Sequence, residues 1–248
     1  MKEQLLFNTT DPLHQNLIAC LWTICYVKMV VGGCDVLLNR RYLSSRLSRK
    51  LIHIAAGSWI LFWPLFNEEH PSWRLNVTVP AIYSVQLFVK GALIQDPNDP
   101  DVQSMSRTGK PIELCKGPLL FTLLMTYCGL YLYMQETGIL IMACLGFGDG
   151  MAPIFGGGIY VPALIFYPTY PFGNHDKKTA SGSIAFFVAS MIGIYIFHSA
   201  LLGEAPLDWS GSMQVAFVAM LVEATTGAYD NPFIAGSVYF THQYLQMK

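Results

Sequence analysis

The sequence predicts an all-α protein: a polytopic transmembrane helical bundle of about seven or eight spans, with one broken helix. Its composition supports this, since 53% of the 248 residues are hydrophobic, only 12% are charged, and the mean hydropathy is +0.40. Soluble domains of this size carry charge on about a quarter of their residues. No polar segment is long enough to build its own core, so we expect residues 1–248 to form a single integral-membrane domain.

Apolar runs of spanning or nearly spanning length recur along the chain. In order they cover residues 17–38, 51–66, 75–94, 117–134, 138–165, 184–202 and 213–229. An eighth run, 233–247, is interrupted by His242 and Gln243, and it either forms a last span or lies against the bundle. The six cysteines lie mostly within these runs without metal-ligand spacing, so we interpret them as small core residues.

The basic residues gather in alternate connections between the runs. These clusters are Arg40, Arg41, Arg46, Arg49 and Lys50 after the first run, Arg107, Lys110 and Lys116 after the third, and Lys177 and Lys178 after the fifth. Basic residues beside spans favour the cytoplasmic side, so we expect these loops in the cytoplasm or the equivalent compartment of an organelle. The endoplasmic reticulum, a plastid membrane and the bacterial inner membrane all fit. The N-terminus shows neither a cleavable secretory signal nor a plastid transit peptide, so we expect the first span to be retained.

A glycine-rich stretch inside the fifth run, CLGFGDGMAPIFGGG (residues 144–158), carries the ionisable residue Asp149 between Gly146, Gly148 and Gly150. A membrane helix tolerates a break only where the freed backbone groups line a polar cavity or are buried in protein. An acid at membrane depth costs about 2.5–3.5 kcal/mol on insertion scales, so it usually has a function. We interpret the stretch as a nucleotide-phosphate and metal site. The alternative is a packing cluster of glycines with an incidental Asp.

Two basic connections on the expected inner side contain groups that suit a triphosphate. Residues 104–118 combine Arg107, Lys110 and Lys116 with Glu113, although a solvated surface loop explains this composition equally well. The pair Lys177–Lys178 precedes the sixth run, where a helix N-terminus can meet a phosphate. We expect a serine, at position 181 or 183, to cap that helix.

Acidic residues reach the same membrane face at the end of the seventh run. Glu223, Asp230 and Asn231 offer the hard oxygen ligands that Mg²⁺ prefers. His53 opens the second run, one helical turn from Arg49, and is either a catalytic group or a hydrogen-bonded core residue.

Five blocks together resemble the polyprenol kinase family, which includes phytol, farnesol and dolichol kinases, and the likeness to phytol kinases is strongest. In order along the chain they are RKLIHIAAG (49–57), SMSRTGKPIELCKGPL (104–119), GFGDGMAPIFG (146–156), KKTASGSIAFF (177–187) and EATTGAYDN (223–231). Two positions differ from the pattern common in phytol kinases, with Pro153 where an Asp often stands and Gly157 in place of a Gly-Arg pair.

The resemblance implies a multi-span phosphotransferase with an alcohol acceptor. It would use CTP, or another nucleoside triphosphate, and Mg²⁺ to phosphorylate an isoprenoid alcohol such as phytol in the lipid bilayer, with no role for nucleic acid. The 146–150 backbone and the basic side chains would hold the phosphates, and Asp149 would hold Mg²⁺ with Asp230 or Glu223. The candidates for a general base are Asp149, Glu223 and His53, in that order.

Three other functions stay open at this point. A lipid-phosphate cytidylyltransferase, like CDP-diacylglycerol synthase, also needs a nucleotide and Mg²⁺ at a membrane face. Secondary transporters also use broken helices with a buried acid, but the sequence shows no internal repeat and its charges gather at one face. An inactive relative with a structural or lipid-binding role would retain the same blocks.

Overall fold

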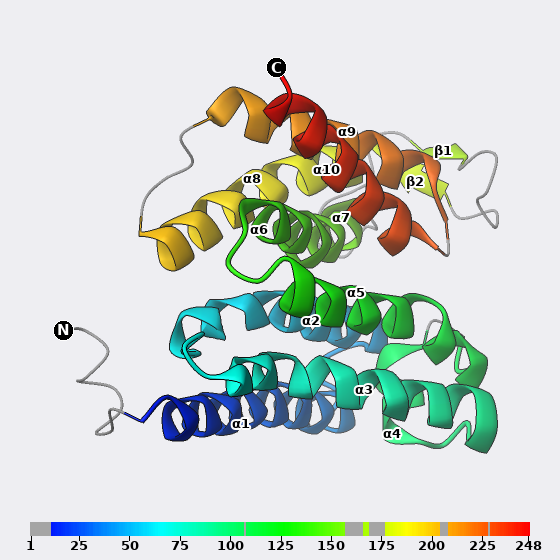
Figure 1. The fold of residues 1–248 in the computed structure, drawn as a ribbon. Helices are drawn as coiled ribbons and strands as arrows, with labels where there is room; N and C mark the ends of the chain where they lie inside the picture. The colour runs from blue at the N-terminus through cyan, green and yellow to red at the C-terminus, as the bar shows by residue number, and fades with distance from the viewer. Residues whose placement is uncertain (1–10, 107, 157–165, 169–176, 204–207, 228) are drawn as a thin grey trace.

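The all-α prediction is confirmed by the computed structural model, which describes residues 11–106, 108–156, 166–168, 177–203, 208–227 and 229–248 (Figure 1). The α-helices are α1 (Pro12–Asn39), α2 (Ser45–Gly57), α3 (Thr78–Phe88), α4 (Pro100–Met105), α5 (Gly117–Tyr131), α6 (Glu136–Ala143), α7 (Asp149–Gly156), α8 (Ala180–Leu202), α9 (Trp209–Thr225) and α10 (Asp230–Gln246). Three 3₁₀ helices (Ser58–Leu65, Pro71–Val77 and Pro111–Cys115) and two π-helical turns (Val89–Ile94 and Cys144–Gly148) extend them. Strands β1 (Phe166–Pro168) and β2 (Lys177–Thr179) pair antiparallel.

The helices form two stacked halves, with α1–α5 in one and α6–α10 in the other (Figure 1). Helix α2 packs against α7 and the π-helical turn before it, and α5 packs against α6 and α10. The two halves therefore meet along α2 and α5. The part of the chain that carries Asp149 lies at this junction.

Among the described residues, five helical stretches are long and apolar enough to cross a membrane. They are Pro12–Asn39, Pro71–Ile94, Pro111–Tyr131, Glu136–Gly156 and Ala180–Leu202. The other three apolar runs are helical as well, in α2 with its 3₁₀ extension, in α9 and in α10. The helices are thus where the sequence predicts them, while membrane crossing by these last three remains a prediction.

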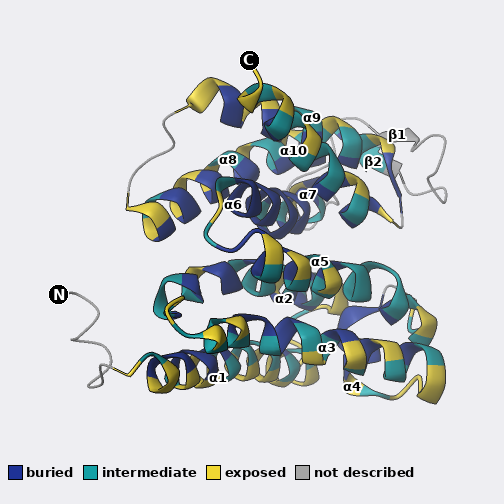
Figure 2. Cartoon of the chain, in the orientation of Figure 1, coloured by how far each residue is buried: buried dark blue, intermediate teal, exposed yellow. Residues whose placement is uncertain are grey.

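Burial follows the pattern of a membrane bundle. Helix α6 lies at the centre, and every residue from Thr137 to Ala143 is buried (Figure 2). Large apolar side chains such as Leu21, Trp22 and Met29 on α1 are exposed. Exposed apolar faces of this extent are not found on soluble monomers, and lipid would cover them here.

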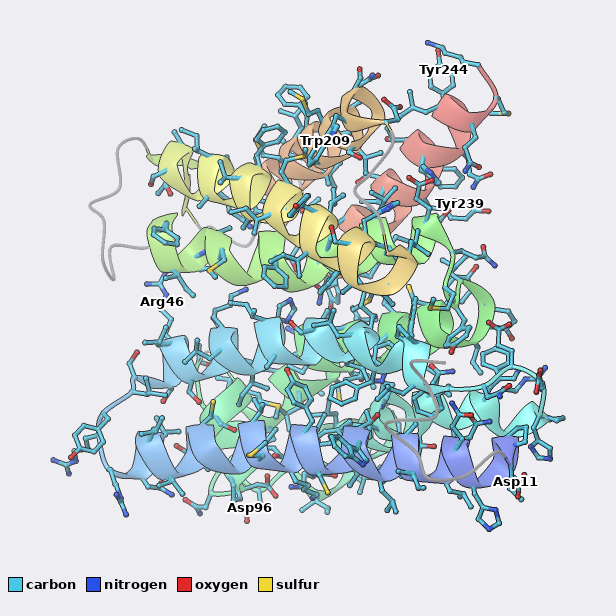
Figure 3. The ribbon with its side chains drawn as sticks, turned by 90° about the vertical axis from the view of Figure 1, so that its left-hand side faces the viewer. Asp11, Arg46, Asp96, Trp209, Tyr239 and Tyr244 are labelled. Carbon is cyan, nitrogen blue, oxygen red and sulfur yellow. The ribbon has the colours of Figure 1, made fainter. Side chains whose placement is uncertain are left out.

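The two ends of the bundle differ in their polar groups. Figure 3 shows Arg46 at one end of the helices, and Asp11 and Tyr244 at the other. At that other end Glu136 lies 3.3 Å from Nε2 of both His198 and His242, so it joins the ends of α6, α8 and α10. The basic residues that begin α2 therefore lie at the opposite end of the bundle from Glu136 and its two histidine partners.

Candidate active site

The interruption predicted in the fifth span is the π-helical turn Cys144–Gly148, which connects α6 to α7. The backbone stays helical through Gly156, and residues 157–165, where the run was expected to end, lie outside the described part of the chain. Single π-helical turns in α-helices are frequent at functional sites. This turn places Asp149 at the first position of α7, with its side chain buried.

The three glycines around Asp149 allow neighbouring helices to approach. A Cβ on Gly146 would lie 2.9 Å from the Cα of Gly57 in α2. A Cβ on Gly148 would collide with Ser190 of α8, and one on Gly150 with Ile54 of α2. Helix packing, the alternative explanation for this glycine-rich stretch, thus accounts for all three glycines. The N–H groups of these glycines lie within a helix, where backbone carbonyls accept their hydrogen bonds, so this geometry does not favour the predicted contact with phosphates. That contact stays a prediction.

Helix α2 supplies the first partner of Asp149. The Ser44 hydroxyl accepts a hydrogen bond from the Leu47 N–H at 3.3 Å and caps the helix, which sets Lys50 and His53 one turn apart on one face. The Lys50 ammonium lies 3.0 Å from Asp149 Oδ2 and donates to the Asp149 carbonyl oxygen at 2.9 Å. Only 9% of the Lys50 side chain and 7% of the Asp149 side chain are exposed. Asp149 is therefore half of a buried ion pair.

His53 is the second partner of Asp149. Its Nε2 lies 3.2 Å from Asp149 Oδ2 and 2.9 Å from the carbonyl oxygen of Leu145. Both oxygens are acceptors, so we assign the proton to Nε2, and a neutral His53 then carries its lone pair on Nδ1. The ring stacks on Phe121 of α5, with centroids 4.0 Å apart. Lys50 and His53 both hold Oδ2, and no described residue hydrogen-bonds to Oδ1.

A second cluster of charges lies beside the first. Lys178, at the end of β2, forms an ion pair with Glu223 of α9 and lies 3.9 Å from Asp230 at the start of α10. Burial disfavours the ammonium, but the two carboxylates outweigh this and raise the pKa of Lys178 above its ordinary value. The charge pair is therefore intact at neutral pH. The contribution of this ion pair to folding stability is complete below the ordinary pKa of lysine. It is lost as the pH rises through the raised pKa of Lys178 in the folded protein.

We expect Lys178→Met to destabilise the protein strongly, because the buried carboxylate of Glu223 would keep its charge after losing the ammonium that pairs with it. Removing one partner of a buried ion pair typically costs about 3–5 kcal/mol, and the lower value applies here because Lys178 is partly exposed. Thermal unfolding in detergent measures the loss. The matched control is Lys110→Met, since Lys110 is exposed. Equal unfolding temperatures for the two variants would contradict this role.

The start of α8 differs in one detail from the prediction. Neither Ser181 nor Ser183 caps the helix. The cap is Thr179, whose Oγ1 accepts from the Gly182 N–H at 3.1 Å and donates to the Gly156 carbonyl at 2.9 Å. Thr179 has the extended backbone of an N-cap residue because it ends β2, and the helix begins one residue later. The same hydroxyl thus joins α7 to α8.

Asp230 and Asn231, at the start of α10, complete the polar cluster. The Asn231 N–H donates to Asp230 Oδ1 at 3.0 Å, and its side-chain amide donates to the Gly117 carbonyl at 3.1 Å. The amide oxygen of Asn231 is buried and has no hydrogen-bond partner among the described residues. Such an oxygen, with carboxylates nearby, suits a cation as its missing partner.

These residues fit Mg²⁺ in the form in which nucleotide enzymes bind it. The described residues contain no group of three or more His, Cys, Asp or Glu side chains that could hold a metal ion. Mg²⁺ with a nucleotide usually takes only one or two protein carboxylates, and phosphates and waters fill the other positions. Asp149 and Asp230, with the Asn231 amide oxygen, meet this requirement.

A cavity of about 300 Å³ opens at this cluster and runs into the N-terminal half of the bundle. Polar and charged groups line one end, namely Arg49, Lys50, His53, Thr108, Glu113, Lys116, Asp149, Asp230 and Asn231. Apolar and aromatic side chains from α1, from α2 and its 3₁₀ extension, and from α3 and α5 line the rest, including Tyr26, Val30, Trp59, Val79, Phe121 and Met125. The cavity therefore suits an amphipathic molecule with one polar end.

The structure brings together only part of the predicted site. Asp149, His53, Asp230 and Lys116 line the cavity, and Lys178 and Glu223 form the adjacent ion pair. Glu113 holds its loop in register as expected, since it accepts hydrogen bonds from the Thr108 N–H and hydroxyl at 3.0 and 2.9 Å. Lys110 is exposed and outside the cavity lining. Arg107 and the side chain of Lys177 lie outside the described part of the chain.

Sequence reasoning assigned Lys50 no role in this site, although its three-residue spacing from His53 predicts that the two side chains share a helix face. Asn231 was predicted as an oxygen ligand beside the acids, but nothing in the sequence indicated that its side-chain amide would also donate to the Gly117 carbonyl.

Comparison with known proteins finds similarity to plant lipid-alcohol kinases. The chain is 32% identical over 224 residues to the "Probable phytol kinase 2, chloroplastic" of Oryza sativa subsp. japonica, a match that covers 83% of this chain and 70% of the relative. It is 30% identical over 207 residues to a probable phytol kinase 1 of Glycine max (79% and 64%) and 29% identical over 188 residues to a farnesol kinase of Arabidopsis thaliana (74% and 58%). The chain thus spans about two thirds of these relatives. No protein-family model and no solved structure matches.

Proposed function

Since this chain belongs to the polyprenol kinase family and is most like the phytol kinases, we propose that it phosphorylates an isoprenoid alcohol in a membrane. The donor is a nucleoside triphosphate, with CTP expected from the family resemblance. Several relatives are named as chloroplastic, which supports a plastid membrane as the location. Phytol and farnesol, the alcohols in the relatives' names, are the first acceptors to test.

The observation that carries this proposal is the shape and lining of the cavity. Its apolar part lies among helices that face lipid, and its polar end holds Asp149, Lys50 and His53. An alcohol that enters this cavity with its hydroxyl first would place that hydroxyl beside Asp149. The long hydrocarbon chain would remain among apolar side chains, where its burial is favourable.

In the proposed reaction the alcohol oxygen attacks the γ-phosphorus. A new O–P bond forms, the bond between the γ-phosphorus and the β–γ bridging oxygen breaks, and a nucleoside diphosphate leaves. Asp149 Oδ1 accepts the hydroxyl hydrogen bond and then the proton, while Lys50 and His53 hold Oδ2 in place. Phosphoryl transfer depends mainly on positioning and on charge neutralisation, which this geometry provides.

Cations at the polar end would receive the triphosphate. Arg49 and Lys116 line the cavity on the side of the basic loops. Mg²⁺, held by Asp230 and the Asn231 amide oxygen, would neutralise the developing phosphate charge. Asp149 Oδ1, the oxygen that Lys50 and His53 leave open, then serves the hydroxyl and not the cation. Glu223 does not line the cavity and is bonded to Lys178, so we give it a structural role in keeping Asp230 and Lys178 together.

The function is tested with purified protein in detergent, phytol or farnesol, and CTP, ATP or UTP labelled at the γ-phosphorus. We expect label in an alkyl monophosphate, with a nucleoside diphosphate as the second product. Excess EDTA should abolish the reaction, and added Mg²⁺ should restore it, since the phosphates need a cation. Release of pyrophosphate from CTP would instead indicate a cytidylyltransferase. Full activity in EDTA would contradict the metal assignment.

A further inference from the structure

We propose that Trp59 closes the deep end of the cavity and so determines how many isoprene units of the acceptor the cavity holds. This inference rests on the proposed function, because it concerns the alcohol that the enzyme would phosphorylate. It adds a specificity-determining residue that lies far from the charged groups.

Helix α2 and the 3₁₀ helix that continues it run along the depth of the cavity. Lys50, His53 and Ala56 of α2, and Trp59 of the 3₁₀ helix Ser58–Leu65, line it at intervals of three residues. Residues rise about 1.5 Å each in an α-helix and about 2.0 Å each in a 3₁₀ helix, so Trp59 lies at least about 13 Å along the axis from Lys50. Ala56 lies about two thirds of the way to Trp59.

The other walls agree on which end is deep. Helix α5 begins beside the polar end at Gly117, and the lining continues inward to Phe121 and then Met125. Helix α3 runs in the opposite direction, so its early residues, Val79 and Pro80, line the same deep end. The deepest residues on these two helices, Val79, Pro80 and Met125, are apolar.

Trp59 is a rigid end wall. It is completely buried, its indole N–H donates to the Asn76 carbonyl at 3.0 Å, and its ring packs edge-on against Trp63 with centroids 5.5 Å apart. On the side away from the cavity, Gly129 leaves no free space, since a Cβ there would collide with Val77, Asn76 and the Trp59 ring. The indole therefore has no room to rotate and lengthen the cavity.

The depth corresponds to a small number of isoprene units. Three bonds of an extended chain span at most about 3.6 Å, so the four bonds of one unit span roughly 5 Å. A depth of about 13 Å thus holds between two and three units. The three units of farnesol would fill the cavity completely, and the fourth unit of phytol would have to lie outside it.

The first experiment measures kcat/KM for alcohols with two, three, four and more units. We expect it to rise roughly tenfold or more from two units to three, since more apolar surface is buried, and to change less than about threefold beyond that. In Ala56→Leu, which shortens the cavity by about one unit, the two-unit alcohol should retain its kcat/KM while the three-unit alcohol loses about tenfold. Gly236→Leu is the matched control, because a Cβ at Gly236 meets no atom within 4 Å.

The second experiment does not require turnover. A farnesol analogue with a diazirine on its last unit should label Trp59, Met125 or Val79 on illumination, and Ala56→Leu should weaken this labelling. Labelling confined to exposed residues such as Ile82 or Met29, or an equal effect of Ala56→Leu on every alcohol, would overturn the inference. A wild-type protein that phosphorylates no alcohol would instead refute the proposed function, and labelling would still locate the chain.

Discussion

Asp149→Asn should lower kcat for alcohol phosphorylation by about two to three orders of magnitude, the usual cost of removing a preorganised electrostatic group from an active site. The amide cannot accept the hydroxyl proton. Asp149 also joins Lys50 and His53 of α2 to α7. Formation of the alkyl monophosphate under saturating substrate measures the effect.

This substitution needs a control for folding, because it leaves the buried Lys50 ammonium beside a neutral amide. Breaking a buried ion pair on one side costs about 3–5 kcal/mol, whereas replacing both partners is often neutral. The double variant Lys50→Met/Asp149→Asn should therefore unfold near the wild-type temperature and still lack activity. Recovery of activity in the double variant would show that Asp149 acts only through stability.

Gly146→Ala should destabilise the protein, because it adds a methyl group where the π-helical turn crosses α2. The new Cβ would lie 2.9 Å from the Gly57 Cα, which is backbone and cannot move aside by a rotamer change. Overpacking of this kind typically costs about 1–3 kcal/mol. It would also push α2 away from α7, so the Lys50–Asp149 contact should lengthen and kcat should fall with stability.

The control for this prediction is Gly236→Ala in α10, where a Cβ meets no atom within 4 Å. There the substitution should stabilise the helix by up to about 1 kcal/mol, because Gly is a poor helix former. Thermal unfolding of both variants in the same detergent tests the contrast. A Gly146→Ala protein as stable as Gly236→Ala would mean that the two helices separate without cost.

The sequence predicted the helices because hydrophobicity along the chain is a local signal. The alternation of basic and acidic connections also predicted which residues lie near the same membrane surface, and it assigned Asp149, His53 and Asp230 to one face. The Lys50–Asp149 contact joins residues 99 positions apart, and periodicity carries no information about such pairs. The glycines were misleading for a related reason, since tight helix crossings and phosphate loops both favour Gly.

Two other features of the site were not predictable from the sequence. The cavity exists because four helices leave a space between them, and no segment encodes that space by itself. The Thr179 cap depended on a short strand pair that the apolar pattern did not reveal. Arg107 and Lys177 keep their predicted phosphate roles as predictions.

The orientation of the cavity determines where the product is released. If the alcohol binds as proposed, its hydroxyl end lies beside the basic loops, and the doubly charged phosphate would form in the leaflet that faces the compartment supplying the nucleotide. The newly charged headgroup would not need to cross the bilayer, and the hydrocarbon tail could diffuse away sideways. An enzyme that consumes this phosphate would then have to reach it from the same side of the membrane.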